Sequence, residues 1–201
     1  MRIHSINWSI YVKNERDFML IDLTLLVTPK MVKDAQGNEK KAFMGHLGTH
    51  FDVMNKEFPL EFTEREAFIF DVSQRVLDEI NINDVNLNEV REHMFIGFYT
   101  GFGDKFPYGS KGYFSTHPQL SNELINTLLE RKVSIIGIDC AGIRRGIEHT
   151  PIDQKCADNH CFVVENLVNL KDVCNKKIII QTFPMNFSDM SGLPCRVIAK
   201  I

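Results

Sequence analysis

Short runs of apolar residues, separated by polar turns, are the dominant pattern along the chain. Their lengths and their content of Val, Ile, Phe and Tyr favour buried strands over helices. The pattern predicts strands at residues 18–27, 67–72, 94–99, 133–139, 162–164, 178–182 and 196–201.

Leucines at helical spacing predict one clear helix in the second half of the chain. Its apolar face carries Leu120, Leu124, Leu128 and Leu129. Ser121 is a suitable N-cap, and we expect the helix to end near Lys132. A shorter helix is predicted over residues 84–92, where Leu and Val recur at mixed spacing.

Two stretches, residues 33–41 and 101–112, are too polar or too rich in glycine for regular structure and predict loops. Only one strand–helix–strand unit is evident. The pattern therefore favours a mixed sheet or barrel with a few flanking helices over a doubly wound parallel sheet. We expect an α/β fold, and 201 residues fit a single domain spanning residues 1–201.

Composition excludes several classes of protein. The apolar fraction of 44% and the charged fraction of 24% are those of an ordinary globular chain. A net charge of -3 gives no electrostatic reason to bind nucleic acid or an anionic membrane. No run is long enough to span a membrane, and residues 1–18 lack the apolar centre of a secretory signal. We therefore expect a cytoplasmic protein.

The five cysteines are odd in number and include no Cys-x-x-Cys pair. A disulfide framework and a structural zinc knuckle are both disfavoured, and most of these side chains are expected to be buried.

The segment from His46 to Asp52 is the strongest chemical signal. His46, Gly48, His50 and Asp52 alternate, and a strand would place their side chains on one face. Gly48 would leave space there for an ion. Two imidazoles and a carboxylate suit zinc, manganese or iron(II), and three protein ligands leave a position open for water. A chance His-x-x-x-His pair is the competing interpretation.

The same segment resembles the His-x-Gly-Thr-His-x-Asp signature of the cyclase family of metal-dependent hydrolases, which includes kynurenine formamidase (arylformamidase) and isatin hydrolase. Other family landmarks lie before and after this segment, in family order. They are Asp22-Leu23-Thr24, Thr100-Gly101-Phe102, Gly137-Ile138-Asp139, Glu165-Asn166-Leu167 and Gly192-Leu193-Pro194-Cys195-Arg196-Val197. The resemblance extends from about residue 20 to the end of the chain.

The resemblance implies a mostly antiparallel, β-barrel-like core with flanking helices, of the swivelling β/β/α type. It implies a divalent ion, usually zinc or manganese, and hydrolysis of an N-formyl or cyclic amide. Members of this family commonly form homodimers or homotetramers, so the resemblance also implies an oligomer.

This sequence departs from the signature at its end, where Lys56 replaces a histidine. In the family that histidine binds a second metal or transfers protons. Lysine is cationic at neutral pH and would repel a second cation, so we expect one metal ion. Lys56 could instead stabilise a carbonyl oxygen or a substrate carboxylate, or be a solvated surface residue.

A second departure lies upstream of Glu165. The family carries a catalytic histidine twelve residues before this glutamate, and here Asp153 occupies that position. Asp153 could act as a general base, and His149 could replace it if shifted inward by one helical turn. His160 is expected at the surface. Glu165 matches the family and would bind metal or orient the attacking water.

Three further features allow both a functional and a structural interpretation. Arg144 and Arg145 could bind an anionic substrate, although a solvated turn is favoured. Cys140 ends a strand but has no neighbouring histidine, which disfavours a nucleophile. Several aromatics could line a substrate pocket or belong to the core: Phe98, Tyr99, Phe102, Phe106 and Tyr108.

The leading hypothesis is a metal-dependent hydrolase of a small amide or lactam, an enzyme acting on C–N bonds other than peptide bonds. An activated water would attack the carbonyl, and Asp153 with Glu165 would handle protons. The alternative is a non-catalytic protein that binds metal or another ligand and retains the fold. A lyase or dehydratase using the same ligands is a third possibility.

Overall fold

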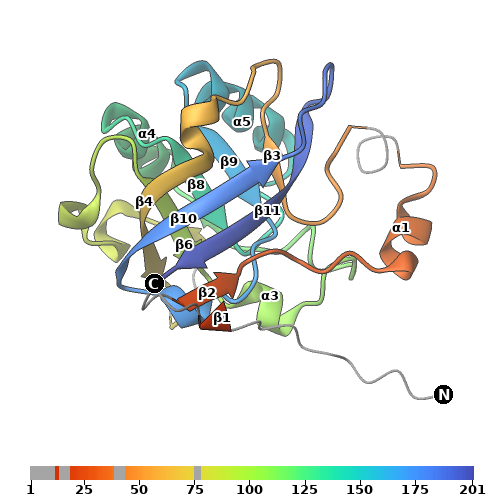
Figure 1. Ribbon diagram of the computed structural model, residues 1–201, viewed down its shortest axis with the longest axis horizontal. Helices are drawn as coiled ribbons and strands as arrows, with labels where there is room; N and C mark the ends of the chain where they lie inside the picture. The colour runs from red at the N-terminus through yellow and green to blue at the C-terminus, as the bar shows by residue number, and fades with distance from the viewer. Residues whose placement is uncertain (1–11, 14–18, 39–43, 75–77) are drawn as a thin grey trace.

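A computed structural model describes residues 12–13, 19–38, 44–74 and 78–201 (Figure 1). Apart from residues 12–13, the N-terminal stretch 1–18 considered above lies outside the described residues. The strands are β1 Val12–Lys13, β2 Met19–Asp22, β3 His50–Asp52, β4 Glu64–Asp71, β5 Glu79–Ile80, β6 Phe95–Tyr99, β7 Gln119–Leu120, β8 Ile135–Ile138, β9 Phe162–Glu165, β10 Lys177–Pro184 and β11 Gly192–Lys200.

The α-helices are α1 Pro29–Ala35, α3 Phe102–Lys105, α4 Asn122–Glu130 and α5 His149–Asp158. Short 3-10 turns occur at Leu60–Thr63, Ile82–Asp84, Leu87–Glu89, Gly146–Glu148 and Leu170–Val173. None of the helices in the described residues is long and apolar enough to cross a membrane.

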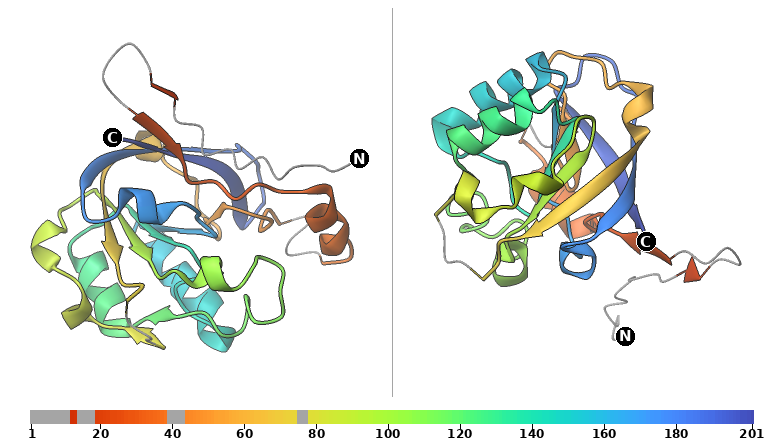
Figure 2. Two further views of the ribbon diagram at one scale, coloured as in Figure 1. Left: turned by 90° about the horizontal axis from the view of Figure 1, so that it is seen from below. Right: turned by 90° about the vertical axis from the view of Figure 1, so that its left-hand side faces the viewer.

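Seven strands close into a mixed barrel in the order β11-β10-β4-β6-β8-β9-β3, because β3 also pairs with β11. Neighbours from β4 through β6 and β8 to β9 are parallel. The other four pairs in the ring are antiparallel. The closed sheet is seen obliquely in Figure 2. The expected α/β, mostly antiparallel barrel-like core with flanking helices is confirmed.

Alternate residues of the parallel strands pack on opposite faces of the sheet. Phe95 and Ile135 point into the barrel and join one hydrophobic core. Ile96 and Ile136 point outward and join a second core, to which α4 contributes Leu124, Ile125 and Leu128. Burial on both faces explains why these strands appear as continuous apolar runs.

The predicted strands correspond to β2, β4, β6, β8, β9, β10 and β11, but β2 ends at Asp22, so the strand predicted over 18–27 extends five residues too far. The leucine-patterned helix is α4, and the Ser121 side chain caps it by accepting a hydrogen bond from Leu124 N–H at 3.1 Å. Asp139, directly after β8, accepts hydrogen bonds from the backbone N–H groups of Thr100 and Gly101. That contact fixes the turn after β6.

Three local predictions were wrong. The predicted loop at 33–41 begins inside α1, which Thr28 caps, and its last residues lie outside the described ranges. The predicted helix at 84–92 is absent; that stretch holds the 3-10 turn Leu87–Glu89, which Asn86 caps, and only the last residue of the turn Ile82–Asp84. The predicted loop at 101–112 contains the single-turn helix α3.

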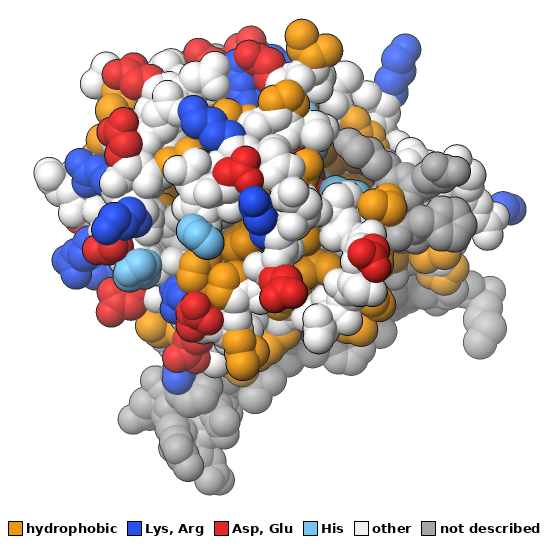
Figure 3. Space-filling model, turned by 90° about the horizontal axis from the view of Figure 1, so that it is seen from above, with side chains coloured by type: hydrophobic (Ala, Val, Ile, Leu, Met, Phe, Trp, Pro, Cys, Tyr) orange, Lys and Arg blue, Asp and Glu red, His pale blue; other side chains and the backbone are white. Residues whose placement is uncertain are grey.

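All five cysteines lie within the described residues and are free thiols, and four of them are buried. Burial raises the pKa of Cys140 well above its ordinary value, which keeps this thiol protonated. On the face seen in Figure 3, acidic and basic side chains are interspersed with hydrophobic ones.

Candidate metal centre

The metal-binding segment is a strand preceded by a glycine turn. His50 and Asp52 belong to β3 and alternate on one face, as the spacing predicted. His46 lies outside the strand. It is reached through Gly45 and Gly48, whose φ values are +81° and +75°. Only glycine adopts this conformation readily, so the turn depends on both positions.

These glycines also allow close packing. A Cβ on Gly45 would lie 2.0 Å from the carbonyl oxygen of Gly192, and one on Gly48 would lie 2.6 Å from Val27 Cγ2. Gly48 was expected to leave room for an ion. Its space is occupied by Val27 instead, and its role is to let the chain turn.

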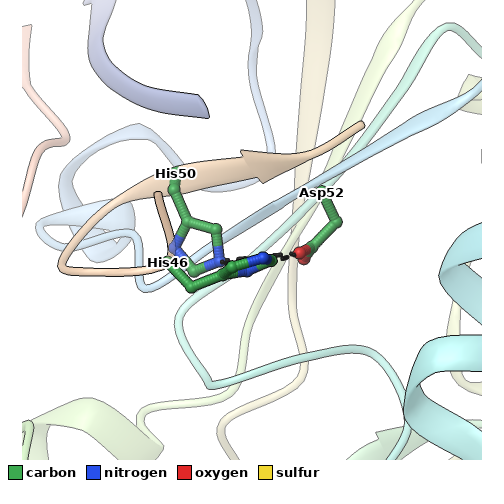
Figure 4. A group of neighbouring side chains, drawn as sticks. All are labelled: His46, His50 and Asp52. Atoms are coloured by element: carbon green, nitrogen blue, oxygen red, sulfur yellow. Dashed lines mark hydrogen bonds and ion pairs between the residues drawn. The ribbon is translucent and has the colours of Figure 1, made fainter. Parts of the chain in front are cut away.

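The three predicted ligands converge (Figure 4). His46 Nδ1 lies 3.0 Å from His50 Nε2 and 2.9 Å from Asp52 Oδ1. His50 Nε2 lies 3.6 Å from the same Asp52 oxygen. His50 and Asp52 are buried and His46 is nearly so. Three donor atoms from seven consecutive residues therefore surround one point.

Hydrogen bonds orient both imidazoles. His50 Nδ1 lies 2.9 Å from the Gly48 carbonyl oxygen, which can only accept, so Nδ1 carries the proton and Nε2 offers a lone pair. His46 Nε2 lies 2.9 Å from Ser191 Oγ, which leaves Nδ1 facing the other ligands. Metal-binding histidines are typically held through the second ring nitrogen in this way.

Asp52 is suited to a cation. In the metal-free protein, burial raises the pKa of its carboxyl, but the charge and hydrogen bonds of His50 and His46 in their protonated forms outweigh burial and hold that pKa below its ordinary value; a bound ion would replace these protons. Asp52 Oδ2 is buried and has no hydrogen-bond partner among the described residues. Such an oxygen is costly unless it has a ligand, so the donor set fits a divalent ion.

A second group of side chains that could hold a metal ion shares Asp52. It adds His149, Asp153 and Glu165, and one ligand atom from each of the four lies within 4.8 Å of the others. His149 Nε2 is 3.4 Å from Asp153 Oδ2 and 3.6 Å from Glu165 Oε1. Glu165 ends β9 and lies opposite His50 in the β3–β9 pair. The structure thus brings Asp153, His149 and Glu165 together beside the first group.

Residues 142–158 are mostly polar, and their second part forms α5, which carries His149 and Asp153 one turn apart. His149 Nδ1 lies 3.0 Å from the Arg144 carbonyl oxygen and therefore donates to it. Nε2 then faces the carboxyl groups of Asp153 and Glu165. A Cβ on Gly142 would lie 2.5 Å from His149 Nδ1, so this glycine makes room for the ring.

Lys56 lies apart from both groups. Its Nζ pairs with Asp158 Oδ1 at 2.7 Å, and both side chains are exposed. The positive charge that was expected to repel a second cation is therefore compensated at the surface. His160 is exposed, as expected.

Arg144 is buried, contrary to the expected solvated turn. It pairs with Glu79 and Glu148, whose carboxylates compensate its charge. Arg145 is partly exposed and pairs with Asp78.

A cavity of about 610 Å³ lies beside the centre. Tyr99 and Tyr108, two of the predicted pocket aromatics, line it. Phe98 belongs to the core, and Phe102 stacks on Phe106 with ring centroids 4.7 Å apart. The lining residues include none of the six residues of the two groups, and the cavity reaches the metal-binding segment through Tyr108, whose hydroxyl oxygen accepts a 3.1 Å hydrogen bond from Gly48 N–H.

Sequence reasoning missed Ser191, which no motif signals because it is distant in the chain from His46. It also assigned no role to Asn166, although this residue follows Glu165 within a recognised landmark. An asparagine directly after Glu165 was the only signal in the sequence that could have indicated a role for position 166.

Comparisons with known proteins agree on the fold. A potential metal-dependent hydrolase with cyclase activity superposes with a TM-score of 0.73 at 22% identity, over 91% of this chain and 98% of that chain. A predicted metal-dependent hydrolase from Bacillus stearothermophilus gives 0.71 at 20% identity, over 91% and 98%. Isatin hydrolase A from Labrenzia aggregata, bound to benzyl benzoate, gives 0.72 at 16% identity, over 92% and 94%. No curated protein sequence matches significantly.

The sequence profile of the family described as "Putative cyclase" matches residues 21–144. That match covers more than half of the 201 residues and includes the segment from His46 to Asp52. The chain therefore belongs to the cyclase family.

Proposed function

We propose that this protein is a metal-dependent hydrolase of a small amide or cyclic amide. The observation that carries the proposal is the convergence of His46, His50 and Asp52, with ring nitrogens oriented for an ion and a buried carboxylate oxygen that needs one. The family supports it, as do structural neighbours described as metal-dependent hydrolases and isatin hydrolase.

His46 Nδ1, His50 Nε2 and Asp52 would hold the ion, zinc or manganese by donor type. When bound, such an ion activates water for attack on a carbonyl carbon and stabilises the resulting oxyanion. The proposal assumes one bound metal ion per chain. The group formed by His149, Asp153 and Glu165 would then act in proton transfer.

These three side chains suit acid–base catalysis because they lie close to one another, with Asp153 and Glu165 buried and His149 partly buried. Glu165 is well placed to accept the proton of the attacking water, since it faces His50 across the strand pair. Asp153 and His149 would share a proton and deliver it to the departing nitrogen as the C–N bond breaks. Water and amide then give acid and amine.

The first experiment is metal analysis of the purified protein, with turnover assays on N-formylkynurenine, isatin and small lactams. We expect about one equivalent of bound metal and C–N hydrolysis that is absent in His50→Ala. Metal far below one equivalent, with no stabilisation by added zinc or manganese, would contradict the proposal.

The alternative, a ligand-binding protein without catalysis, is favoured by the aspartate at position 153 where the family carries a histidine. It predicts bound metal without turnover on any amide or lactone. Turnover that Asp153→Asn abolishes would exclude it.

The proposed enzyme would act as a homodimer or homotetramer. Support comes from hydrophobic side chains exposed at the β10–β11 hairpin, Phe183, Met185 and Phe187. Light scattering tests this, because a monomer at micromolar concentration would contradict it.

A further inference from the structure

Asn166 follows Glu165 directly at the end of β9 and is buried, with 2% of its surface exposed. We propose that Asn166 is a positioning residue that fixes the ring of the metal ligand His50 through the Gly48 carbonyl group. The inference rests on the proposed metal centre and adds a residue to which no role in that centre has been given.

The contact runs through a single oxygen atom. Asn166 Nδ2 donates to the Gly48 carbonyl oxygen at 2.9 Å. His50 Nδ1 donates to the same oxygen, also at 2.9 Å. The two donor nitrogens lie 3.5 Å apart. The carbonyl therefore has both acceptor positions occupied, and its direction determines where the His50 ring points.

Asn166 is itself held so that its amide can point only one way. The Tyr113 hydroxyl donates to Asn166 Oδ1 at 2.8 Å, which places Nδ2 on the side of Gly48. The backbone of Asn166 donates to the Cys140 carbonyl at 2.9 Å and accepts from Thr49 Oγ1 at 2.8 Å. A buried side chain with this many fixed partners is rigid, which a positioning role requires.

The residue type follows from these contacts. Position 166 has φ +58°, which asparagine tolerates better than most residues. The side chain must also offer one donor and one acceptor. Aspartate would direct an oxygen at the Gly48 oxygen, and glycine would keep the backbone but supply neither group.

The chain contains a matched control. Asn169 also lies in the left-handed region, with φ +57°. Its Nδ2 donates to the Asp22 carbonyl at 2.8 Å, away from the metal ligands. Asn166→Gly and Asn169→Gly therefore each delete a donated hydrogen bond from the same backbone conformation, but only the first changes the support of His50.

The test compares the wild type with both glycine variants. Zinc affinity is measured by chelator competition, and the coordination of Co²⁺ is followed by its visible absorption spectrum. We expect Asn166→Gly to weaken zinc binding about 10- to 100-fold and to change the Co²⁺ spectrum, as loss of an outer-shell partner typically does. Asn169→Gly should leave both unchanged, even where it lowers the melting temperature.

Imidazole ¹H–¹⁵N spectra of the metal-free proteins give a readout that does not depend on metal. The Nδ1–H form of His50 should dominate in the wild type and in Asn169→Gly, and mix with the other tautomer in Asn166→Gly. Tyr113→Phe, a milder change that leaves Asn166 in place, should shift the same signals in the same direction.

Two outcomes separate this inference from the proposed function. Wild-type zinc binding with equal affinity, spectrum and tautomer in Asn166→Gly would overturn the positioning role alone. Absence of zinc and Co²⁺ binding in the wild type would overturn the proposed function instead, and the tautomer comparison would still decide the role of Asn166.

Discussion

His50 and Glu165 lie directly opposite each other on the antiparallel strands β3 and β9, and His50 Nε2 is 3.6 Å from Glu165 Oε2. One strand pair thus carries a proposed metal ligand and a proposed proton acceptor in register. Both side chains are buried, and their positions are set by backbone pairing instead of by a mobile loop. Rigid placement on strands favours precise acid–base geometry.

The first prediction concerns Glu165→Gln. The amide keeps the size of the side chain but cannot accept a proton, so we expect kcat to fall about 10²- to 10⁴-fold. Metal bound by His46, His50 and Asp52 should remain near one equivalent. Steady-state kinetics and metal analysis measure both, and Glu66→Gln, on the exposed end of β4, is the control. Unchanged kcat would remove Glu165 from proton transfer.

The second prediction concerns the metal itself. Because Asp52 Oδ2 is buried without a partner among the described residues, an ion should stabilise the folded state. At a free concentration 100 times the dissociation constant, one bound ion adds about 2.7 kcal/mol to the free energy of unfolding. We expect chelation to lower the melting temperature by several degrees, and zinc or manganese to restore it.

His50→Ala should abolish this restoration, because it removes the buried imidazole at the middle of the set. Calorimetry with and without metal measures the difference. An equal shift in wild type and His50→Ala would place the stabilising ion elsewhere.

The three proposed metal ligands differ in how well their positions could be predicted from the sequence. The alternation of His50 and Asp52 could be predicted because a strand imposes a period of two. His46 satisfied the same spacing for another reason, since it reaches the centre through left-handed turns at Gly45 and Gly48. The sequence shows that glycines are present at these positions. It does not show that Gly45 packs against Gly192, because that contact joins residues far apart in the chain.

Helix α5 could not be predicted from hydrophobic periodicity. Its buried side chains are Ile152, Asp153, Cys156 and Ala157, so a charged residue occupies part of its inner face. Polar residues on an inner face obscure the amphipathic signal on which helix prediction depends. The strands β6, β8 and β9, by contrast, were evident because both of their faces are buried. Closure of the barrel through β3 and β11 depends on long-range pairing that no local pattern shows.

The third prediction tests whether His149 needs the space above Gly142. Gly142→Ala would place a methyl group 2.5 Å from His149 Nδ1 and force the ring away from Asp153 and Glu165. We expect activity to fall about as far as in His149→Ala, with metal retained. Gly146→Ala is the matched control, because Gly146 also has a positive φ but has nothing within 4 Å of the added methyl.

The kinetics and melting temperatures of Gly142→Ala and Gly146→Ala are measured together. They distinguish the effect of backbone strain from the effect of displacing the His149 ring. Gly146→Ala should lose stability of order 1 kcal/mol, the cost of a left-handed alanine, and Gly142→Ala should lose more, because its methyl group also meets the His149 ring and the Arg144 carbonyl oxygen. Equal activity in the two would show that the position of His149 is not needed for turnover.

The last prediction is a pH dependence of stability that arises from Asp139. Burial raises the pKa of this carboxyl to about 6, although hydrogen bonds from Thr100 and Gly101 oppose the shift. Its ordinary value is 3.8, so between these two pH values the folded state binds more protons than the unfolded state. The contribution of Asp139 to the free energy of unfolding is therefore complete below about pH 4 and is lost as the pH rises through about 6. The loss amounts to at most about 3 kcal/mol.

Asp139→Asn cannot titrate, so its destabilisation relative to wild type should be larger at pH 4 than at pH 7. Urea unfolding at several pH values measures this difference. His117 affects the same range with the opposite sign, because burial lowers its pKa to about 4 and stability is lost as the pH falls from about 6.5. The contribution of His117 is common to both proteins and cancels in the comparison. Parallel stability curves for wild type and Asp139→Asn would show that Asp139 is already ionised throughout this range, with its hydrogen bonds outweighing burial.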